Sequence, residues 1–379
     1  MEFLPDFNVS IVLYLFVAFA CLAFLQLLYV LFIHARFAFF KNSKSFKNDA
    51  QPAVSVIIAA RNESDNLYLN LPLILQQKYP DFEVIVVNHQ SIDESYHILN
   101  AYKMQFPNLR VVEVEPSRHL GNGKKLPLTL GIKAAKNEHL IFTDADCQPA
   151  SNLWLQGMMS KFSDEKQIVI GYGPYQVEKG FLNKVIRLDT AFIAMNYFSF
   201  ALTKMPYMAV GRNLAYTKKT FESVHGFKSH YSIHSGDDDL FIQEAAKNRN
   251  FNIQIEKETF CYSKAKTTWK TWAQQKSRHY STAGHYNVIK KTLLGIYPLT
   301  LLMLWISFVI LMFDSEYRWI TLACFGFIIG IKWWIQGMCF AKLKATSFIA
   351  FLPFLDLFYA ILVPSMFYTA EKSTTSTWK

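Results

Sequence analysis

Three groups of residues in the 379-residue chain have the types and spacing that chemistry requires, and the first is Asp144-Ala-Asp146. Its two carboxylates are separated by one residue, so they project to the same side of an extended segment. Two like charges that close repel each other unless a cation lies between them. A hard divalent cation such as Mg²⁺ or Mn²⁺ takes carboxylate oxygens and shares its coordination shell with phosphates. A solvated turn is the alternative for so short a motif.

The second group is the acidic run Asp237-Asp238-Asp239, which precedes the helical pattern 240–246. A carboxylate at the start of a helix, facing a cleft, is well placed to act as a general base, and we expect Asp237 or Asp238 in that role. The run also has a structural interpretation, because Asp caps helices and complements the helix dipole in the first turn. The two interpretations are compatible.

The third group is Gln275 and Arg278, which lie three residues apart in a helix expected over 267–285. Residues with this spacing share a helix face. The planar guanidinium of arginine stays charged and makes bidentate contacts with phosphate, so this face suits a diphosphate. The alternative is a basic juxtamembrane helix that rests on anionic lipid.

The elements that must position these groups follow from hydrophobic runs. Four short runs rich in β-branched residues predict buried strands, at 53–60, 82–88, 109–114 and 138–143. Helical segments alternate with them, which predicts an α/β fold with a mostly parallel sheet. Ligands bind beyond the carboxyl ends of such strands. Asn62, Asn88 and Asp144 all stand at these ends, so we expect them at one edge of the sheet.

Four apolar stretches are long enough to cross a bilayer, which takes about 20 residues. They are 9–33, 293–313, 319–338 and 348–369. The first is too long for a signal peptide, and its leader holds Glu2 and Asp6 with no basic residue, so we expect an uncleaved anchor. The section 50–290 then forms one large domain between one amino-terminal and three carboxyl-terminal transmembrane helices.

The distribution of charge predicts the orientation. The net charge of +10 is concentrated next to the apolar stretches, as in Arg36, Lys41, Lys290, Lys291 and Lys342. Lysine and arginine mark cytoplasmic segments, so we expect the large domain in the cytoplasm and both termini on the other side of a bacterial inner membrane. This accounts for the basic charge and removes the main support for a nucleic-acid partner.

Two charges fall inside the predicted spans. Lys332 and Asp356 are equally distant in sequence from the connecting turn near Lys344, so an antiparallel hairpin brings them to one depth. We expect an ion pair there, with snorkelling of Lys332 to the membrane surface as the alternative. The apolar segment 180–206 has two interpretations as well, an interfacial segment that guides a lipid or an ordinary core helix.

Composition excludes other classes of protein. With 51% hydrophobic and 18% charged residues, the chain is not intrinsically disordered. Five cysteines without metal-ligand spacing exclude a disulfide-stapled domain.

The ordered set of motifs resembles membrane-bound glycosyltransferases of family 2, which have the GT-A fold, and is most similar to ceramide glucosyltransferases and polysaccharide synthases. Asp144-Ala-Asp146 resembles the DxD metal motif, Asp237–Asp239 the acidic ED/TED motif, and Gln275–Arg278 the (Q/R)xxRW motif. The other matching pieces are 54–63, 123–132 and 211–216.

The resemblance implies roles for individual residues. Nucleotide-sugar binding falls to Ala60, Asn62, Glu63, Asn88, Lys124, Asp144, Gln275 and Arg278. Asp144 and Asp146 would hold Mg²⁺ or Mn²⁺, and Asp237 or Asp238 would take the acceptor proton. The implied reaction is an inverting transfer from a nucleotide sugar, a UDP-sugar, to a lipid or membrane-bound glycan acceptor.

Thr129 replaces a usual Asn of the family pattern, and two other departures bear on function. Asn88 stands where an Asp is usual, and His279 stands where the last motif has Trp. Asn88 weakens the prediction of a uridine nucleotide, and His279 argues against a processive polymerase. A processive polysaccharide synthase and an inactive nucleotide-sugar-binding membrane subunit are the alternative functions.

Overall fold

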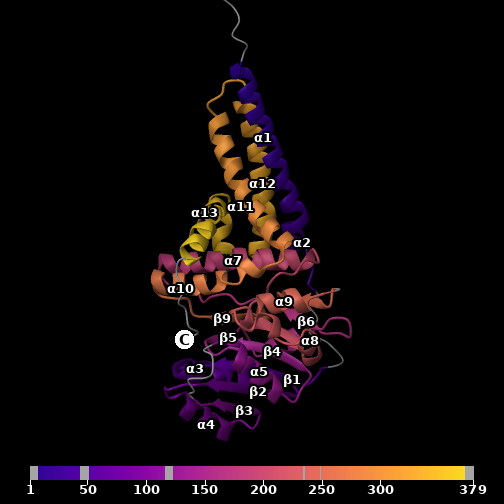
Figure 1. Cartoon of the computed structure of the whole chain (residues 1–379), viewed down its shortest axis with the longest axis vertical. Coiled ribbons are helices and arrows are strands. Elements are labelled where there is room, and N and C mark those ends of the chain that lie inside the picture. Colours follow the sequence, from indigo (N-terminus) through magenta and orange to yellow (C-terminus); the bar gives the residue numbers. More distant parts are fainter. Residues whose placement is uncertain (1–6, 43–50, 116–122, 234, 248, 372–379) are drawn as a thin grey trace, which may run out of the picture.

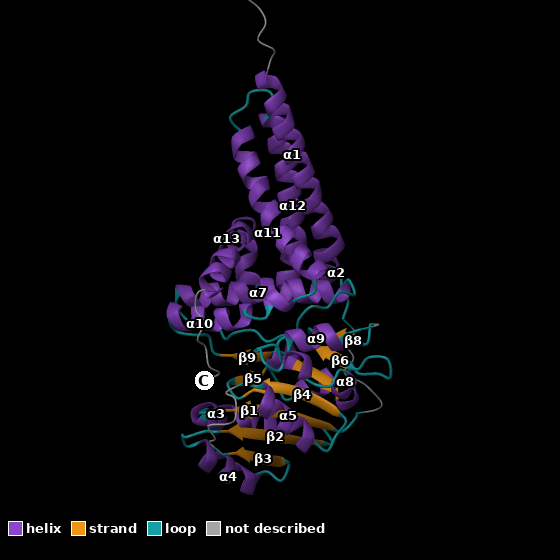
Figure 2. Cartoon of the chain, viewed as in Figure 1, coloured by secondary structure: helices purple, strands orange, loops and turns teal. Residues whose placement is uncertain are grey.

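The structure is a computed structural model that describes residues 7–42, 51–115, 123–233, 235–247 and 249–371. The molecule is elongated, with a sheet domain at one end and a bundle of long helices at the other (Figure 1). Helix α7, Phe181–Leu202, lies across the molecule between these two parts. Figure 2 shows that every long helix of the bundle lies on the same side of α7.

The domain is built on a seven-stranded sheet of order β3-β2-β1-β4-β7-β6-β8. Its strands are β1 (Val54–Ala60), β2 (Phe82–His89), β3 (Leu109–Val114), β4 (His139–Asp144), β6 (Ile168–Ile170), β7 (Leu214–Thr217) and β8 (Phe251–Ile253). The strands β1 to β4 pair in parallel, whereas β7 runs antiparallel to both of its neighbours. The α/β prediction with a mostly parallel sheet is therefore confirmed. A separate pair joins β5 (Cys147–Pro149) to β9 (Cys261–Ser263).

Helices cover both faces of this sheet, which explains why its central strands carry apolar residues on both faces. All seven residues of β1 are buried. Ile57 and Ala59 belong to one hydrophobic cluster, and Val56 and Ile58 belong to the cluster on the opposite face. The helices of the domain are α3 (Ser64–Leu75), α4 (Ser95–Gln105), α5 (Lys125–Ala134), α6 (Trp154–Met159), α8 (Lys218–Ser223), α9 (Asp239–Ala245) and α10 (Trp269–Tyr280).

The bundle consists of the helices predicted as membrane spans. They are α1 (Phe7–Tyr29), continued through a π-helical turn (Val30–His34) into α2 (Ala35–Ala38), then α11 (Val288–Leu311), α12 (Arg318–Lys342) and α13 (Leu352–Glu371). In the described part of the chain, five helices have the length and apolar composition to cross a membrane. The fifth is α7, most of which is buried. The segment 180–206 therefore contains a core helix.

Helix α13 corresponds to the predicted fourth span, and its packing contacts show which elements it lies against. Before it, the side chain of Phe348 packs under the guanidinium of Arg187 from α7. Near its other end, Leu362 and Met366 pack on the cluster that contains Trp272 of α10. Both ends of α13 thus contact elements next to the sheet domain. An apolar stretch of this length fits a crossing helix, but these contacts place α13 along the base of the bundle.

The two charges in the bundle form the predicted ion pair. Lys332 Nζ lies 3.1 Å from Asp356 Oδ2, and both residues are 2% exposed. Lys332 therefore points into the bundle rather than toward the membrane surface.

Candidate active site

A single cavity of about 780 Å³ begins at the carboxyl ends of β1 and β4 and reaches the helices of the bundle. Eight of the eleven residues predicted for the site line it: Glu63, Lys124, Asp144, Asp146, Asp237, Asp238, Gln275 and Arg278. Residues from α7, α11 and α13 line its far part. The cavity therefore joins a charged region in the sheet domain to an apolar region among the long helices.

The charged region is centred on Asp144, the last residue of β4. Lys124 Nζ lies 2.5 Å from Asp144 Oδ1 and 3.6 Å from Asp237 Oδ2, so one ammonium group bridges two of the predicted motifs. Burial raises the pKa of Asp144, but Lys124, with Arg212 and Arg278, outweighs burial and holds that pKa below its usual value. Asp144 is consequently ionised at neutral pH.

The same region brings together three side chains with metal-ligating atoms. Oxygen atoms of Asp144 and Asp146 and the sulfur of Cys147 all lie within 4.8 Å of one another. Burial raises the pKa of the Cys147 thiol well above its usual value, so this sulfur keeps its proton and is a poor ligand. Two carboxylates from the chain, with diphosphate oxygens completing the shell, suit Mg²⁺ or Mn²⁺. In the structure, the ammonium of Lys124 supplies the positive charge.

The three consecutive aspartates at the start of α9 have different surroundings. Asp238 Oδ2 accepts from the Gly211 N–H at 2.8 Å, and its Oδ1 accepts from the Asp239 N–H. Asp239 is buried and accepts hydrogen bonds from the hydroxyls of Thr282 and Tyr286. Asp237 faces Lys124 in the cavity.

These surroundings also affect protonation. Burial, reinforced by the carboxylates of Asp237 and Asp239, raises the pKa of Asp238 to about 8. Both oxygens of Asp238 nevertheless contact backbone donors, so its geometry is that of a positioning residue.

The lysine beside Lys124 holds the loop before these aspartates. Lys125 Nζ donates to the backbone oxygens of His230, Ile233 (2.8 Å) and Ser235 (2.7 Å). The first turn of α5 therefore directs Lys124 to the acidic cluster and Lys125 to the loop that carries it. The role of Lys125 was not predicted, because sequence adjacency does not show which way each side chain points.

Helix α10 brings Gln275 and Arg278 to the opposite side of the cavity. Thr268 caps the helix by accepting from the Thr271 N–H. Lys276 Nζ forms a buried ion pair with Asp189 of α7 at 2.8 Å, which fixes the rotation of α10. Gln275 then reaches the hydroxyl of Tyr175 at 3.2 Å. Gln275 and Arg278 therefore face the cavity.

His279, which replaces the expected Trp, also lines the cavity. Burial, together with Arg278 and Lys276, lowers its pKa well below the usual value, so the imidazole is neutral.

Three predicted residues lie at the neighbouring strand ends but do not line this cavity. Ala60 pairs with Asn88 in the sheet, and the amide of Asn88 donates to Glu113 at 2.8 Å. Asn62 accepts from the Ile92 N–H, and its own N–H donates to Ser91 Oγ, which ties the loop after β1 to the loop after β2. Their roles in nucleotide binding stay predictions.

Sequence reasoning missed Arg212 and Tyr175. Arg212 lies 4.7 Å over the ring of Tyr175, and its guanidinium donates to the backbone oxygen of Gly173. Both side chains line the cavity, and Arg212 adds positive charge near Asp144. The position of Arg212 inside the segment 211–216 was the available signal.

Comparisons with known proteins agree with this geometry. Residues 55–227 match the family model "Glycosyl transferase family 2", and residues 142–368 match "Glycosyl transferase family group 2". The mannosyltransferase PcManGT from Pyrobaculum calidifontis, solved with GDP-Man and Mn²⁺, has the same fold, with a TM-score of 0.55. It is 17% identical, and the superposition covers 89% of this chain and 98% of that one.

Two curated relatives have similar sequences. The probable glycosyltransferase YdaM of Bacillus subtilis is 25% identical over 250 residues, which cover 63% of this chain and 57% of YdaM. The UDP-Glc:alpha-D-GlcNAc-diphosphoundecaprenol beta-1,3-glucosyltransferase WfaP of Escherichia coli is 26% identical over 132 residues, 34% of this chain and 48% of WfaP. The chain thus spans about half the length of these relatives. The second family model covers more than half of this chain, and the chain belongs to the family 2 glycosyltransferases, with a GT-A fold.

Proposed function

We propose that this protein transfers a sugar from a nucleotide sugar to a lipid acceptor at the membrane. The supporting observation is the continuity of the cavity, which joins the acidic cluster of the sheet domain to apolar residues of α7, α11 and α13. A sugar nucleotide fits the charged end, whereas a hydrocarbon chain fits the apolar end. A water-soluble acceptor would not need the second end.

The residues around the charged end suggest how the transfer proceeds. The acceptor oxygen forms a bond to the anomeric carbon of the sugar while the bond from that carbon to the diphosphate breaks. Asp237 takes the hydroxyl proton, because its carboxylate faces the cavity, whereas both oxygens of Asp238 contact backbone donors. The nucleoside diphosphate leaves with its added charge beside Arg278.

Asp144 and Asp146 would hold the cation in this scheme. When bound, such a cation would supply positive charge to the diphosphate leaving group. Lys124 would leave Asp144 and Asp237 when the donor binds. We infer that Lys124 turns to the diphosphate, which leaves Asp237 available as a base.

We also propose that the protein is integral to a bacterial inner membrane, with the sheet domain in the cytoplasm. The basic residues Arg36 and Lys41 lie in and just after α2, Lys290 lies in the first turn of α11, and Lys342 is the last residue of α12. Lysine and arginine at such helix ends mark the cytoplasmic side. Nucleotide sugars would reach the charged end of the cavity from that compartment.

The experiment is incubation of the purified full chain with Mn²⁺ or Mg²⁺, radiolabelled nucleotide sugars and a total bacterial lipid extract. UDP-sugars come first, because WfaP is named for UDP-Glc, and GDP-Man second, because PcManGT was solved with it. We expect label in the organic phase. Label in a long polymer would indicate a processive synthase instead, and metal-dependent UDP binding without turnover would indicate an inactive subunit.

A further inference from the structure

Two helices form the walls of the apolar end of the cavity. One wall is α11, which contributes Leu294, Gly295, Pro298, Leu299 and Leu302. The other is α13, which contributes Tyr359, Ala360, Val363 and Pro364. We call the space between these two sets of residues the apolar arm. Leu299 is 58% exposed, so this side of the arm lies next to the surface that faces lipid.

Gly295 is the informative residue in this wall. A glycine inside a helix costs about 1 kcal/mol relative to alanine. Its backbone is helical, and a Cβ placed on it would meet no atom within 4 Å. Neither strain nor packing therefore explains the glycine. Because Gly295 lines the cavity, its missing side chain has one structural effect, which is to widen the arm.

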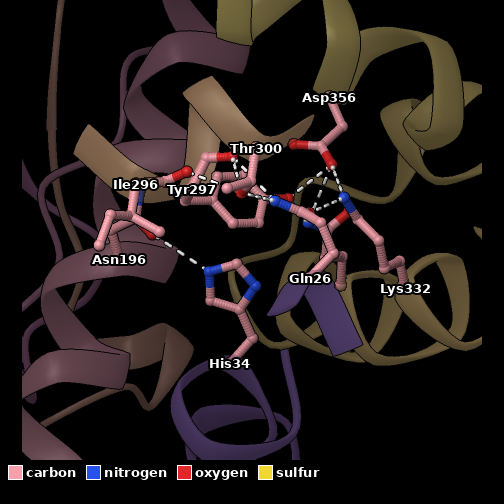
Figure 3. Close-up of polar contacts among 9 residues, drawn as sticks. Gln26, His34, Asn196, Ile296, Tyr297, Thr300, Lys332 and Asp356 are labelled. Carbon is pink, nitrogen blue, oxygen red and sulfur yellow. Dashed lines mark hydrogen bonds and ion pairs between the residues drawn. The ribbon is translucent and has the colours of Figure 1, made fainter. Parts of the chain in front are cut away.

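The second wall is held by buried polar side chains (Figure 3). Asp356 of α13 accepts from the hydroxyl of Tyr297 at 2.6 Å and pairs with Lys332 of α12 at 3.1 Å. Lys332 also donates to Gln26 Oε1 of α1, and Gln26 Nε2 donates to Thr300 Oγ1 of α11. These contacts join α1, α11, α12 and α13 at one point, and we call the set the polar node.

The polar node borders the arm directly, because the side chain of Tyr297 belongs to both. Charged groups are costly in an apolar helix bundle, and a well-packed apolar contact would stabilise it as well or better. Through Asp356, the node links α13 to Tyr297 of α11 and Lys332 of α12, which constrains the depth and rotation of α13 relative to α11. That relation sets the width of the arm.

We propose that the apolar arm binds the hydrocarbon chain of the acceptor, that Gly295 determines which chains fit, and that Lys332 and Asp356 position α13 as the second wall. That the acceptor is a lipid comes from the proposed function, on which this inference rests. It adds the place where the chain lies and the residues that select it. The occupant is a hydrocarbon chain, because apolar side chains line the arm and the acidic cluster lies at its other end.

The test compares G295L with G330L in the full-length protein. Gly330 of α12 is a matched control, because a Cβ there also meets nothing within 4 Å and the residue does not line the cavity. The probe is a long-chain alkyl alcohol with a mid-chain diazirine, used without nucleotide. We expect labelling of α11 and α13 in the wild type and in G330L, and a loss of about tenfold in G295L. Labelling at Phe327, a lipid-facing residue of α12, is the internal reference.

Equal labelling of the wild type and G295L in α11 and α13 would overturn the inference. Radiolabelled sugar transfer to extracted lipid is measured in parallel. Lipid glycosylation that survives in G295L with unchanged labelling would refute the chain site and leave the proposed function intact. Selective labelling without glycosylation by the wild type would refute the proposed function and leave the chain site intact.

The positioning role of the polar node needs a separate readout. D356A removes the carboxylate that pairs with Lys332, and we expect the KM for the lipid acceptor to rise about tenfold with an unchanged KM for the donor. The conservative double variant K332Q/D356N removes both charges and keeps hydrogen-bonding groups, so it should restore the acceptor KM. A purely structural role would instead lower the amount of active enzyme and leave both KM values unchanged, which would overturn the positioning role.

Discussion

Asp237 and Asp238 are adjacent in sequence and differ in what their carboxylates contact, so they should differ in kinetics. We expect D237N to lower kcat by about 10²–10⁴-fold, the usual contribution of a general base. D238N should cost about tenfold, because it disturbs the bond to the Gly211 N–H without removing the base. The measurement is kcat for sugar transfer at saturating donor. A larger loss in D238N than in D237N would reverse the assignment.

Lys124 occupies the position between Asp144 and Asp237 that positive charge must fill. Without a metal, K124M should destabilise the protein by about 1–2 kcal/mol, less than for a fully buried pair because Asp144 is partly exposed. Added Mn²⁺ should then raise the unfolding temperature more in K124M than in the wild type. Equal metal-induced shifts in the two proteins would show that Lys124 does not substitute for the cation. K133M, on the last turn of α5, serves as a control.

Among the secondary-structure elements, α10 is joined to α7 by a buried ion pair, in addition to the packing of Trp272. Lys276 and Asp189 are each 5% exposed in their side chains. Burial lowers the pKa of Lys276, but Asp189 outweighs burial and raises it, so the lysine stays charged. We expect K276M to lower the free energy of unfolding by about 3–5 kcal/mol, because it leaves Asp189 buried and unpaired.

The same variant should also raise the KM for the donor, because α10 carries Gln275 and Arg278. The double variant K276M/D189L should recover most of the unfolding temperature. If it recovers the donor KM as well, apolar packing suffices to orient α10, and the ion pair has no specific positioning role.

The sequence predicted the elements that depend on local patterns. The strands β1 to β4 follow from runs of β-branched residues, and Asp144 lies at a strand end because the run stops there. The Lys332–Asp356 pair followed from equal distances to a turn. The course of α13 could not be predicted, because hydropathy reports length and apolarity but not which neighbours a helix packs against. The choice between Asp237 and Asp238 likewise depends on side-chain directions that only tertiary contacts determine.

For the molecule as a whole, the course of α13 changes the expected arrangement in the membrane. Both of its ends contact elements beside the sheet domain, so Ser365 should lie on the same side of the membrane as that domain. The turn between α11 and α12, which contains Ser315, should lie on the other side.

Labelling of single cysteines in sealed vesicles tests this arrangement. The exposed Cys21 and Cys324 are first replaced by serine. S365C and K103C, the latter on α4 of the sheet domain, should react with an impermeant maleimide from one side, and S315C from the other. Reaction of S365C together with S315C would show that α13 crosses the bilayer, as first expected from its length.

The buried position of α7 has a consequence for synthesis of the chain. This helix has the length and apolarity that a translocon accepts, yet in the folded protein it lies beneath the bundle, where Phe192 packs on Phe340 of α12 and Tyr359 of α13. Those two helices follow α7 in the chain and leave the ribosome after it. Until they arrive, α7 is an incompletely covered apolar segment, and only Lys184, Arg187 and Asp189 near its start oppose insertion. Correct biogenesis therefore depends on capture of α7 by the nascent sheet before the insertion machinery engages it.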